Sequence, residues 1–300
     1  MPDPLSNILV IGGTRYFGAH LVRQLLAQGH RVTIATRGQA DDDFGPRVQR
    51  LRIDRKDTET LRKALGDSRF EVVYDQICNQ PSEALAATAL FRNRAGLVVM
   101  TSTQSVYGPG AKLRETHFNP KAVKVSEVDC ANYAEGKRQV EGAYFQQASF
   151  PLIAVRFPIV LGPDDYTKRL RFHVERVIRG QPIIIANPEA QISFIHSEEA
   201  GQFLAWVPQS ALRGPVNACS DGQITIGEFI RTIEEVVARK AHLIVHRSPP
   251  ASPDLSPFAI SESWAMDTRL ARKAGFAFRN LSDWLPPLIA QIAADITGRL

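Results

Sequence analysis

Cysteine is scarce in this chain, and its sequence contains no long hydrophobic run. The three cysteines among 300 residues, Cys78, Cys130 and Cys219, stand far apart and show no metal-ligand spacing. This sparse, odd-numbered set favours reduced thiols, so we expect a cytoplasmic protein without a bound metal. No stretch approaches the roughly 20 apolar residues of a membrane helix. The opening residues, Met1–Pro4, lack the basic and apolar regions of a signal peptide, so we expect no membrane association.

A strong excess of charge of one sign is also missing. The 36 basic and 31 acidic residues leave a net charge of +5, and both kinds are spread along the chain. This small positive net charge is not typical of a dedicated nucleic-acid-binding protein, but it suits an anionic ligand such as a phosphate ester. We therefore expect a small-molecule substrate and no nucleic-acid partner.

The most informative stretch lies near the start, where residues 7–18 read NILVIGGTRYFG. The apolar run is typical of a strand buried on both faces of a parallel sheet, and residues 19–27 have apolar side chains at helical spacing. Strand, glycine turn and helix form the context of a dinucleotide fingerprint, because glycines let the backbone approach a pyrophosphate. The alternative is an ordinary glycine-rich turn. The cofactor contacts expected here are Gly12, Thr14, Arg15, Tyr16, Phe17 and Gly18.

Strands alternate with helices through the first half of the chain. Apolar runs predict strands at 31–36, 48–53, 71–78, 97–100 and 152–157, and helical spacing predicts helices at 58–65, 82–92 and 132–147. This alternation predicts an α/β protein with a Rossmann-type, doubly wound parallel sheet of about seven strands. Ligands of such a sheet bind at the carboxyl ends of its strands.

The second half lacks this regular alternation of strands and helices, because prolines divide it into shorter segments. Its patterns predict helices at 169–179, 198–206, 225–240, 267–274 and 281–296, and strands at 192–196, 215–217 and 243–246. We interpret this half as a smaller C-terminal α/β cap. The dinucleotide-binding domain is expected to comprise residues 1–162 plus about 194–220, and the substrate-binding cap about 163–193 plus 221–300.

The sharpest catalytic pattern is Tyr133-Ala-Glu-Gly-Lys137, on the helix between the fifth and sixth predicted strands. A separation of four residues puts both side chains on one helix face. An ammonium group near a phenol favours the phenolate form. Tyr133 can then exchange a proton with a substrate hydroxyl while a nicotinamide ring exchanges hydride, and Lys137 can also hold the cofactor ribose. The alternative is a solvated helix face that carries the two residues by chance.

A segment rich in hydroxyl groups, TSTQSVYG at residues 101–108, directly follows the fifth predicted strand. Hydroxyls at the carboxyl end of a strand can bond a substrate oxygen beside the tyrosine. The alternative is a loop whose serine and threonine side chains bond their own backbone.

Together these segments resemble the extended short-chain dehydrogenase/reductases, the branch that holds NAD(P)-dependent epimerases and dehydratases of nucleotide sugars. The resemblance runs nearly end to end, and further motifs that carry it are RFPIVLGP at 156–163, FIHSEEA at 194–200 and VNACSDGQITIGEF at 216–229. It implies a redox step at a sugar carbon, with a catalytic triad that falls on Thr103, Tyr133 and Lys137. It also implies a homodimer through the two helices that flank the fourth and fifth strands. Further cofactor contacts are expected at Thr36, Arg37, Asp54, Arg55, Cys78, Thr101, Ser102, Tyr133, Lys137, Phe157 and Pro158.

The chain departs from this family's pattern where the substrate is usually held. Ile159 stands where an asparagine is usual, and Ile192 stands where an arginine often binds a diphosphate. The substrate contacts that we expect instead, on a phosphate-bearing sugar, are Gln104, Lys168 and Arg171. For the two cations, a solvated basic helix face is the alternative.

The expected choice of cofactor depends on two arginines. An NAD enzyme usually has an acid at the end of the second strand, whereas Thr36 stands there in this sequence and Arg37 follows. Arg15 replaces the middle glycine of the family's fingerprint. Both arginines can converge on a 2′-phosphate, since an arginine can bind a phosphate with two charge-assisted hydrogen bonds. We expect NADP in preference to NAD; the alternative is that both arginines point into solvent.

The Gly-Gly-Thr-Arg form of the turn is similar to that of chloroplast stem-loop RNA-binding relatives. An RNA-binding or regulatory protein on the same fold is therefore the alternative function. We expect a structural role for His196, and a packing role rather than a nucleophilic one for Cys78.

Overall fold

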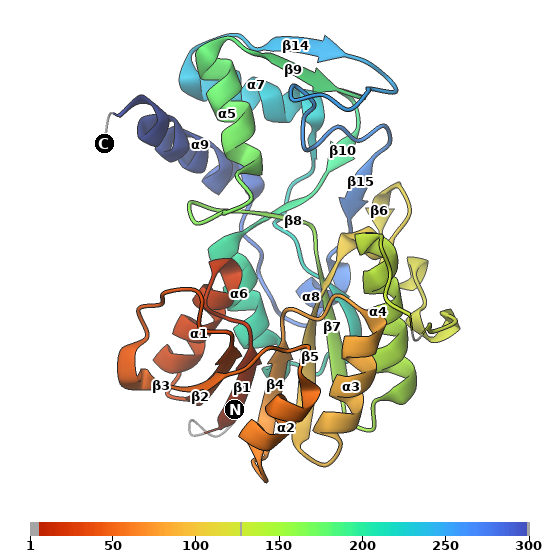
Figure 1. Ribbon diagram of the computed structural model, residues 1–300. Helices are drawn as coiled ribbons and strands as arrows, with labels where there is room; N and C mark the ends of the chain where they lie inside the picture. Colours follow the sequence, from red (N-terminus) through yellow and green to blue (C-terminus); the bar gives the residue numbers. More distant parts are fainter. Residues whose placement is uncertain (1–5, 127, 299–300) are drawn as a thin grey trace.

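The computed structural model describes residues 6–126 and 128–298 of the chain, so Met1–Pro4 lie outside the described residues. Within them, the main sheet has seven parallel strands in the order β12-β7-β5-β4-β1-β2-β3 (Figure 1). These strands are β1 (Asn7–Ile11), β2 (Arg31–Thr36), β3 (Val48–Arg52), β4 (Phe70–Asp75), β5 (Ala95–Thr103), β7 (Leu152–Phe157) and β12 (Gly214–Asn217). The predicted fold class is confirmed, and the strand order turns back between β1 and β4, which creates a ligand crevice at their carboxyl ends.

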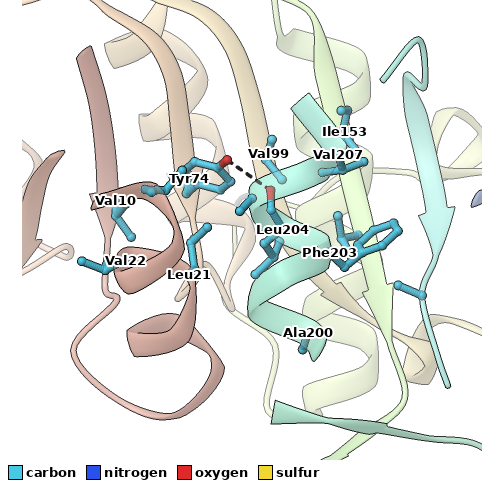
Figure 2. Packing of buried hydrophobic residues seen from close by; sticks show 14 of the residues in the cluster. Val10, Leu21, Val22, Tyr74, Val99, Ile153, Ala200, Phe203, Leu204 and Val207 are labelled. Carbon is cyan, nitrogen blue, oxygen red and sulfur yellow. Dashed lines mark hydrogen bonds between the residues drawn. The ribbon is translucent and has the colours of Figure 1, made fainter. Parts of the chain in front are cut away.

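Alternate side chains of each strand face opposite layers of helices. Ile8 and Val10 of β1 pack in the core that includes α1 (Tyr16–Ala27) and α6 (Ser197–Trp206). Leu9 and Ile11 pack in a second core with α2 (Thr58–Leu65), α3 (Pro81–Phe91) and α4 (Tyr133–Gln147). Figure 2 shows the first core, where the hydroxyl of Tyr74 in β4 donates a 3.1 Å hydrogen bond to the carbonyl of Leu204 in α6.

The second half of the chain builds a body with its own hydrophobic core, which stands beyond the carboxyl ends of the main sheet (Figure 1). Its helices are α5 (Arg169–Arg179), α7 (Ile226–Val237) and α9 (Leu281–Thr297), beside the parallel pair β9 (Pro182–Ile185) and β14 (His242–Val245). The segments that join it to the main sheet are β6 (Gly110–Leu113), β8 (Ile159–Leu161), β10 (Gln191–Ile192), β11 (Phe194–His196), β13 (Ile224–Thr225), β15 (Trp264–Met266) and α8 (Arg269–Lys273).

Short strands account for the main differences from the sequence-based expectation. The single strand predicted at 192–196 is wrong, because β10 and β11 belong to different sheets. Ser193 separates them, and its hydroxyl accepts a 2.9 Å hydrogen bond from the backbone N–H of Met266. The sequence pattern predicts none of β6, β8, β9 and β15, because pieces of three or four residues are too short to show a period.

A buried ion pair fastens α4 to the main sheet. The guanidinium of Arg156 in β7 donates to the two carboxylate oxygens of Glu141 at 2.9 and 2.6 Å, and both side chains are fully buried. Arg156 also donates a 2.8 Å bond to the hydroxyl of Tyr107, and the Ser102 hydroxyl donates to Glu141. These bonds fix α4 against the carboxyl ends of β5 and β7.

Removing one partner of this pair should destabilise the fold strongly. We expect Glu141→Ala to lower the free energy of unfolding by about 3–5 kcal/mol, because it leaves the Arg156 charge buried and unpaired. Chemical denaturation measures this change. The control is Glu59→Ala, whose partner Arg62 lies 2.7 Å away on the exposed face of α2; its effect on stability should be far smaller, because water screens an exposed pair. Equal losses in the two variants would contradict the structural role given to the buried pair.

Candidate active site

A cleft of about 550 Å³ opens at the carboxyl ends of β1 to β4. The expected cofactor residues that line it are Gly12, Thr14, Arg15, Tyr16, Phe17, Thr36, Arg37, Asp54 and Arg55. Gly18 lies in the first turn of α1, behind this lining. The remaining ones stand at or just beyond the carboxyl ends of β4, β5 and β7, or at the start of α4: Cys78, Thr101, Ser102, Phe157, Pro158, Tyr133 and Lys137.

The glycine turn brings its backbone close to the cleft. Gly12 and Gly13 have φ values of +96° and +89°, a region that favours glycine. Gly18 has an ordinary helical position, yet a Cβ there would lie 2.7 Å from the Oε1 atom of Gln76 and 3.0 Å from the Cα atom of Gly13. The turn therefore needs glycine at 18 for close packing rather than for its φ, and it presents the start of α1 to the cleft, where an anion is favoured.

Lys137 is held at the sheet edge by two backbone carbonyls. Its Nζ atom donates to the carbonyl oxygens of Cys78 at 2.8 Å and Thr101 at 2.7 Å, and the residue is 2 % exposed. Tyr133, one turn earlier on α4, is 58 % exposed. Cys78 follows Ile77, whose Cγ2 atom lies 3.2 Å from the position of a Cβ on Gly12. Lys137 thus lies close to the glycine turn, at the carboxyl ends of β4 and β5, and Tyr133 precedes it by one helical turn.

In the segment that follows β5, some polar side-chain atoms have hydrogen-bond partners and others have none. The Thr103 hydroxyl accepts a 3.2 Å bond from the Ser105 N–H, and Ser102 donates to Glu141. Among the described residues, the buried Oγ1 atom of Thr101 and Oε1 atom of Gln104 have no hydrogen-bond partner. Such unpaired atoms are costly unless a bound group satisfies them.

Three more unpartnered polar atoms among residues 6–126 and 128–298 belong to residues that line the cleft: Nε2 of Gln76, the hydroxyl of Tyr16 and Nε of Arg55. Donors and acceptors at this edge, beside a glycine turn that leaves room for a phosphate, fit a dinucleotide with its ribose and amide groups. The nicotinamide half would lie towards Lys137 and the adenosine half towards Thr36 and Asp54.

Arg55 lines the cleft, but its guanidinium already forms an ion pair with a buried carboxylate. Its guanidinium is paired with Asp75, at the end of β4, and lies 3.6 Å from Glu83. Asp75 also accepts a 2.5 Å bond from the hydroxyl of Tyr144 in α4. Arg55 therefore links the loop after β3 to β4 and α3 beneath the cleft, and its charge is already compensated.

Arg15 and Arg37, in contrast, form no ion pair with any carboxylate within the described part of the chain. The Thr36 hydroxyl accepts a 3.2 Å bond from the N–H of Gly38. The cleft thus contains two uncompensated guanidinium groups. Lys168 and Arg171, at the start of α5, lie outside its lining.

Cys78 and His196 lack the properties of reacting groups. Burial raises the pKa of the Cys78 thiol to about 12, so no thiolate is present near neutrality. Burial lowers the pKa of His196 to about 4, and its Nδ1 atom accepts a 3.2 Å bond from the N–H of Glu198 at the start of α6. The His196 imidazole caps a helix, in agreement with the expected structural role.

Sequence reasoning missed several residues of the cleft, including Gln76, Ile77 and Tyr166. Ile77 and Tyr166 are unusually exposed for apolar side chains, at 42 % and 65 %. Position was the available signal for Gln76 and Ile77, which fall at the end of the strand predicted at 71–78, whereas β4 ends earlier, at Asp75. Tyr166 stands in a polar loop without any periodic pattern, and only the folded chain brings it to the cleft.

A doubly wound parallel sheet, a glycine turn at the start of α1 and a cleft at the carboxyl edge define a dinucleotide-binding enzyme of the Rossmann type. Residues 8–219 match the model of the NAD dependent epimerase/dehydratase family. The chain belongs to this family and is an NAD-dependent enzyme. Within the described residues, no helix is long and apolar enough to cross a membrane.

Curated relatives are distant but cover much of the chain. UDP-glucuronic acid decarboxylase 6 of Arabidopsis thaliana is 24% identical over an alignment of 306 positions. The alignment covers 84% of this chain and 83% of that protein. The chloroplast stem-loop binding protein of 41 kDa b of the same plant is 28% identical over 201 residues, 63% of this chain and 51% of that protein. This chain therefore spans about half the length of the second relative.

Solved structures share the fold over nearly the whole chain. UDP-glucuronic acid 4-epimerase from Bacillus cereus, in complex with UDP-glucuronic acid and NAD, aligns with a TM-score of 0.73 and 18% identity, covering 98% of this chain and 100% of that one. UDP-glucose 4-epimerase from Thermus thermophilus, in complex with NAD, aligns with a TM-score of 0.68 and 19% identity, covering the same shares of each chain.

The close packing at Gly18 gives a direct test of the glycine turn. We expect Gly18→Ala to weaken dinucleotide binding by about ten-fold or more, because a methyl group 3.0 Å from the Cα atom of Gly13 must displace the turn. Isothermal titration with NAD and NADP measures the loss. Gly108→Ala is the matched control, since a Cβ at Gly108 meets nothing within 4 Å. Unchanged affinity in Gly18→Ala would contradict the place given to the pyrophosphate.

Proposed function

We propose that this chain is an epimerase/dehydratase-type oxidoreductase that acts on a hydroxyl or carbonyl of a nucleoside diphosphate sugar. The observation that carries the proposal is the Tyr133–Lys137 pair at the sheet edge, with the lysine ammonium held by the carbonyls of Cys78 and Thr101. Relatives that act on UDP-sugars support the substrate class. Thr103 completes the proposed triad from the end of β5.

In this proposal the chain's own residues hold the sugar and move its proton. The bound nicotinamide supplies hydride exchange with a sugar carbon. Tyr133 exchanges a proton with the hydroxyl or carbonyl oxygen on that carbon, and its exposed phenol is accessible to a substrate. Two carbonyls fix the Lys137 ammonium, whose third N–H is available for a ribose hydroxyl. The Thr103 hydroxyl donates to the same sugar oxygen.

We further propose that the cap around α5, α7 and α9 holds the nucleotide part of the substrate. Its separate hydrophobic core supports a division into two domains, although Leu161 and Phe194, from the proposed cofactor side (residues 1–162 and about 194–220), pack into it, and Ala271 and Phe278 pack into the core of the main sheet. Gln104, with its unpartnered Oε1 atom, Lys168 and Arg171 are the proposed substrate contacts. A homodimer through α3 and α4 and a cytoplasmic location stay predictions.

Tyr133→Phe tests the proposed chemistry. We expect turnover to fall by about 10²–10⁴-fold, since the phenol is the proton-transfer group, while dinucleotide affinity stays nearly unchanged. The assay combines purified chain with UDP-glucose or UDP-glucuronic acid and follows products by mass spectrometry, after identification of any small molecule that co-purifies. Near-full turnover in Tyr133→Phe would overturn the assignment. Salt-sensitive RNA binding by this variant, with no turnover of any sugar nucleotide by the wild type, would favour the RNA-binding alternative.

We propose NADP as the preferred cofactor, since Arg15 and Arg37 line the cleft without carboxylate partners among the described residues and Thr36 replaces an acid. Arg37→Ala should then weaken NADP binding by about ten-fold and leave NAD binding nearly unchanged, because only NADP carries the 2′-phosphate. Arg15→Ala should have the same effect. The control is Arg31→Ala, at the opposite end of β2 from the cleft. Equal affinities for the two dinucleotides, unaffected by either change, would contradict this choice.

A further inference from the structure

Tyr166 combines strong exposure with a place in the cofactor cleft. Its side chain is 65 % exposed, yet it lines the cleft whose other residues follow β1, β2, β3 and β4. Its ring meets the ring of Tyr16 edge to face, with centroids 5.8 Å apart and planes at 74°. An aromatic ring at the rim of a cleft can pack against a ligand that enters it.

The segment that carries Tyr166 is fastened to the helices beneath it. Asp164 accepts a 2.7 Å hydrogen bond from the Ser197 hydroxyl of α6 and lies 3.1 Å from Nε2 of His20 in α1. Asp165 accepts a 2.8 Å bond from the N–H of Thr167. The second bond is a turn within the loop, so Asp164 is the anchor to the helices, and Tyr166 lies two residues beyond it in the lining of the cleft.

The ring contact places Tyr166 close to the start of α1. Tyr16 is the first residue of α1 and directly follows the glycine turn. The N–H groups of that turn and helix start are where a pyrophosphate binds. A ring that contacts Tyr16 from the cap side of the cleft therefore stands over the pyrophosphate position, opposite the glycine backbone.

We infer that Tyr166 is a cofactor-binding residue whose ring covers the pyrophosphate and slows release of the dinucleotide. Neither the glycine fingerprint nor the Tyr133–Lys137 pair involves this residue. The inference rests on the dinucleotide site of the proposed function but is independent of the substrate. Retention matters in such an enzyme, because a cofactor that is restored within each cycle need not leave between turnovers.

The test measures the rate of dinucleotide release from the full-length chain. NADPH or NADH is bound, excess NADP or NAD is added, and the loss of bound-cofactor fluorescence is followed by stopped flow. We expect Tyr166→Ala to release the dinucleotide about ten-fold faster, because removal of the ring opens the path by which the bound pyrophosphate leaves. Tyr166→Phe keeps the ring and should release at close to the wild-type rate. The matched control is Val245→Ala, a truncation of a 55 % exposed side chain on β14.

Three results would overturn the inference. Release from Tyr166→Ala within about two-fold of wild type would show that the ring does not retain the cofactor. Equally fast release from Tyr166→Phe and Tyr166→Ala would assign the effect to the hydroxyl. A wild-type chain that binds neither dinucleotide would overturn the cofactor assignment together with this inference, whereas the first two results leave that assignment standing.

Discussion

The candidate site depends on how one buried ammonium group is accommodated. A lysine charge away from water costs several kcal/mol unless hydrogen bonds compensate it. In this chain the compensation comes from the carbonyls of Cys78 and Thr101, which lie just beyond β4 and near the end of β5. Helix α4 must therefore occupy one position along the strands of the sheet, and the Glu141–Arg156 ion pair holds it there. The position of Tyr133, one turn before Lys137, is a consequence of this arrangement.

The parallel sheet explains why residues so far apart in sequence converge. Every strand ends at the same edge, so the turn after β1, the loop after β4 and the hydroxyl segment after β5 lie side by side. Several polar atoms without partners in the described part of the chain lie at this edge, among them those of Gln76, Thr101 and Gln104, while the buried carboxylates of Asp75 and Glu141 each pair with an arginine. The chain keeps unsatisfied hydrogen-bonding capacity where a ligand can use it.

Much of this arrangement can be predicted from the sequence, because long apolar runs and helical spacing are strong local signals. The glycine turn, the strands of the main sheet and the Tyr133–Lys137 spacing are of this kind. Ion-pair partners are not local: nothing near Arg55 in sequence indicates that Asp75 occupies its guanidinium. Tyr166 was likewise unpredictable, since its contact with Tyr16 joins two residues that are 150 positions apart in the sequence. The break at Ser193 separates two strands too short for a periodic signal to show.

The central claim is that one carboxyl edge holds both the glycine turn and the reacting pair of a dinucleotide enzyme. A crystal structure of the chain with bound NADP or NAD tests it most directly. The account predicts the pyrophosphate at the start of α1 and a nicotinamide ribose hydroxyl within about 3 Å of the Nζ atom of Lys137. A dinucleotide bound elsewhere, or one whose nicotinamide half points away from Tyr133 and Lys137, would contradict it.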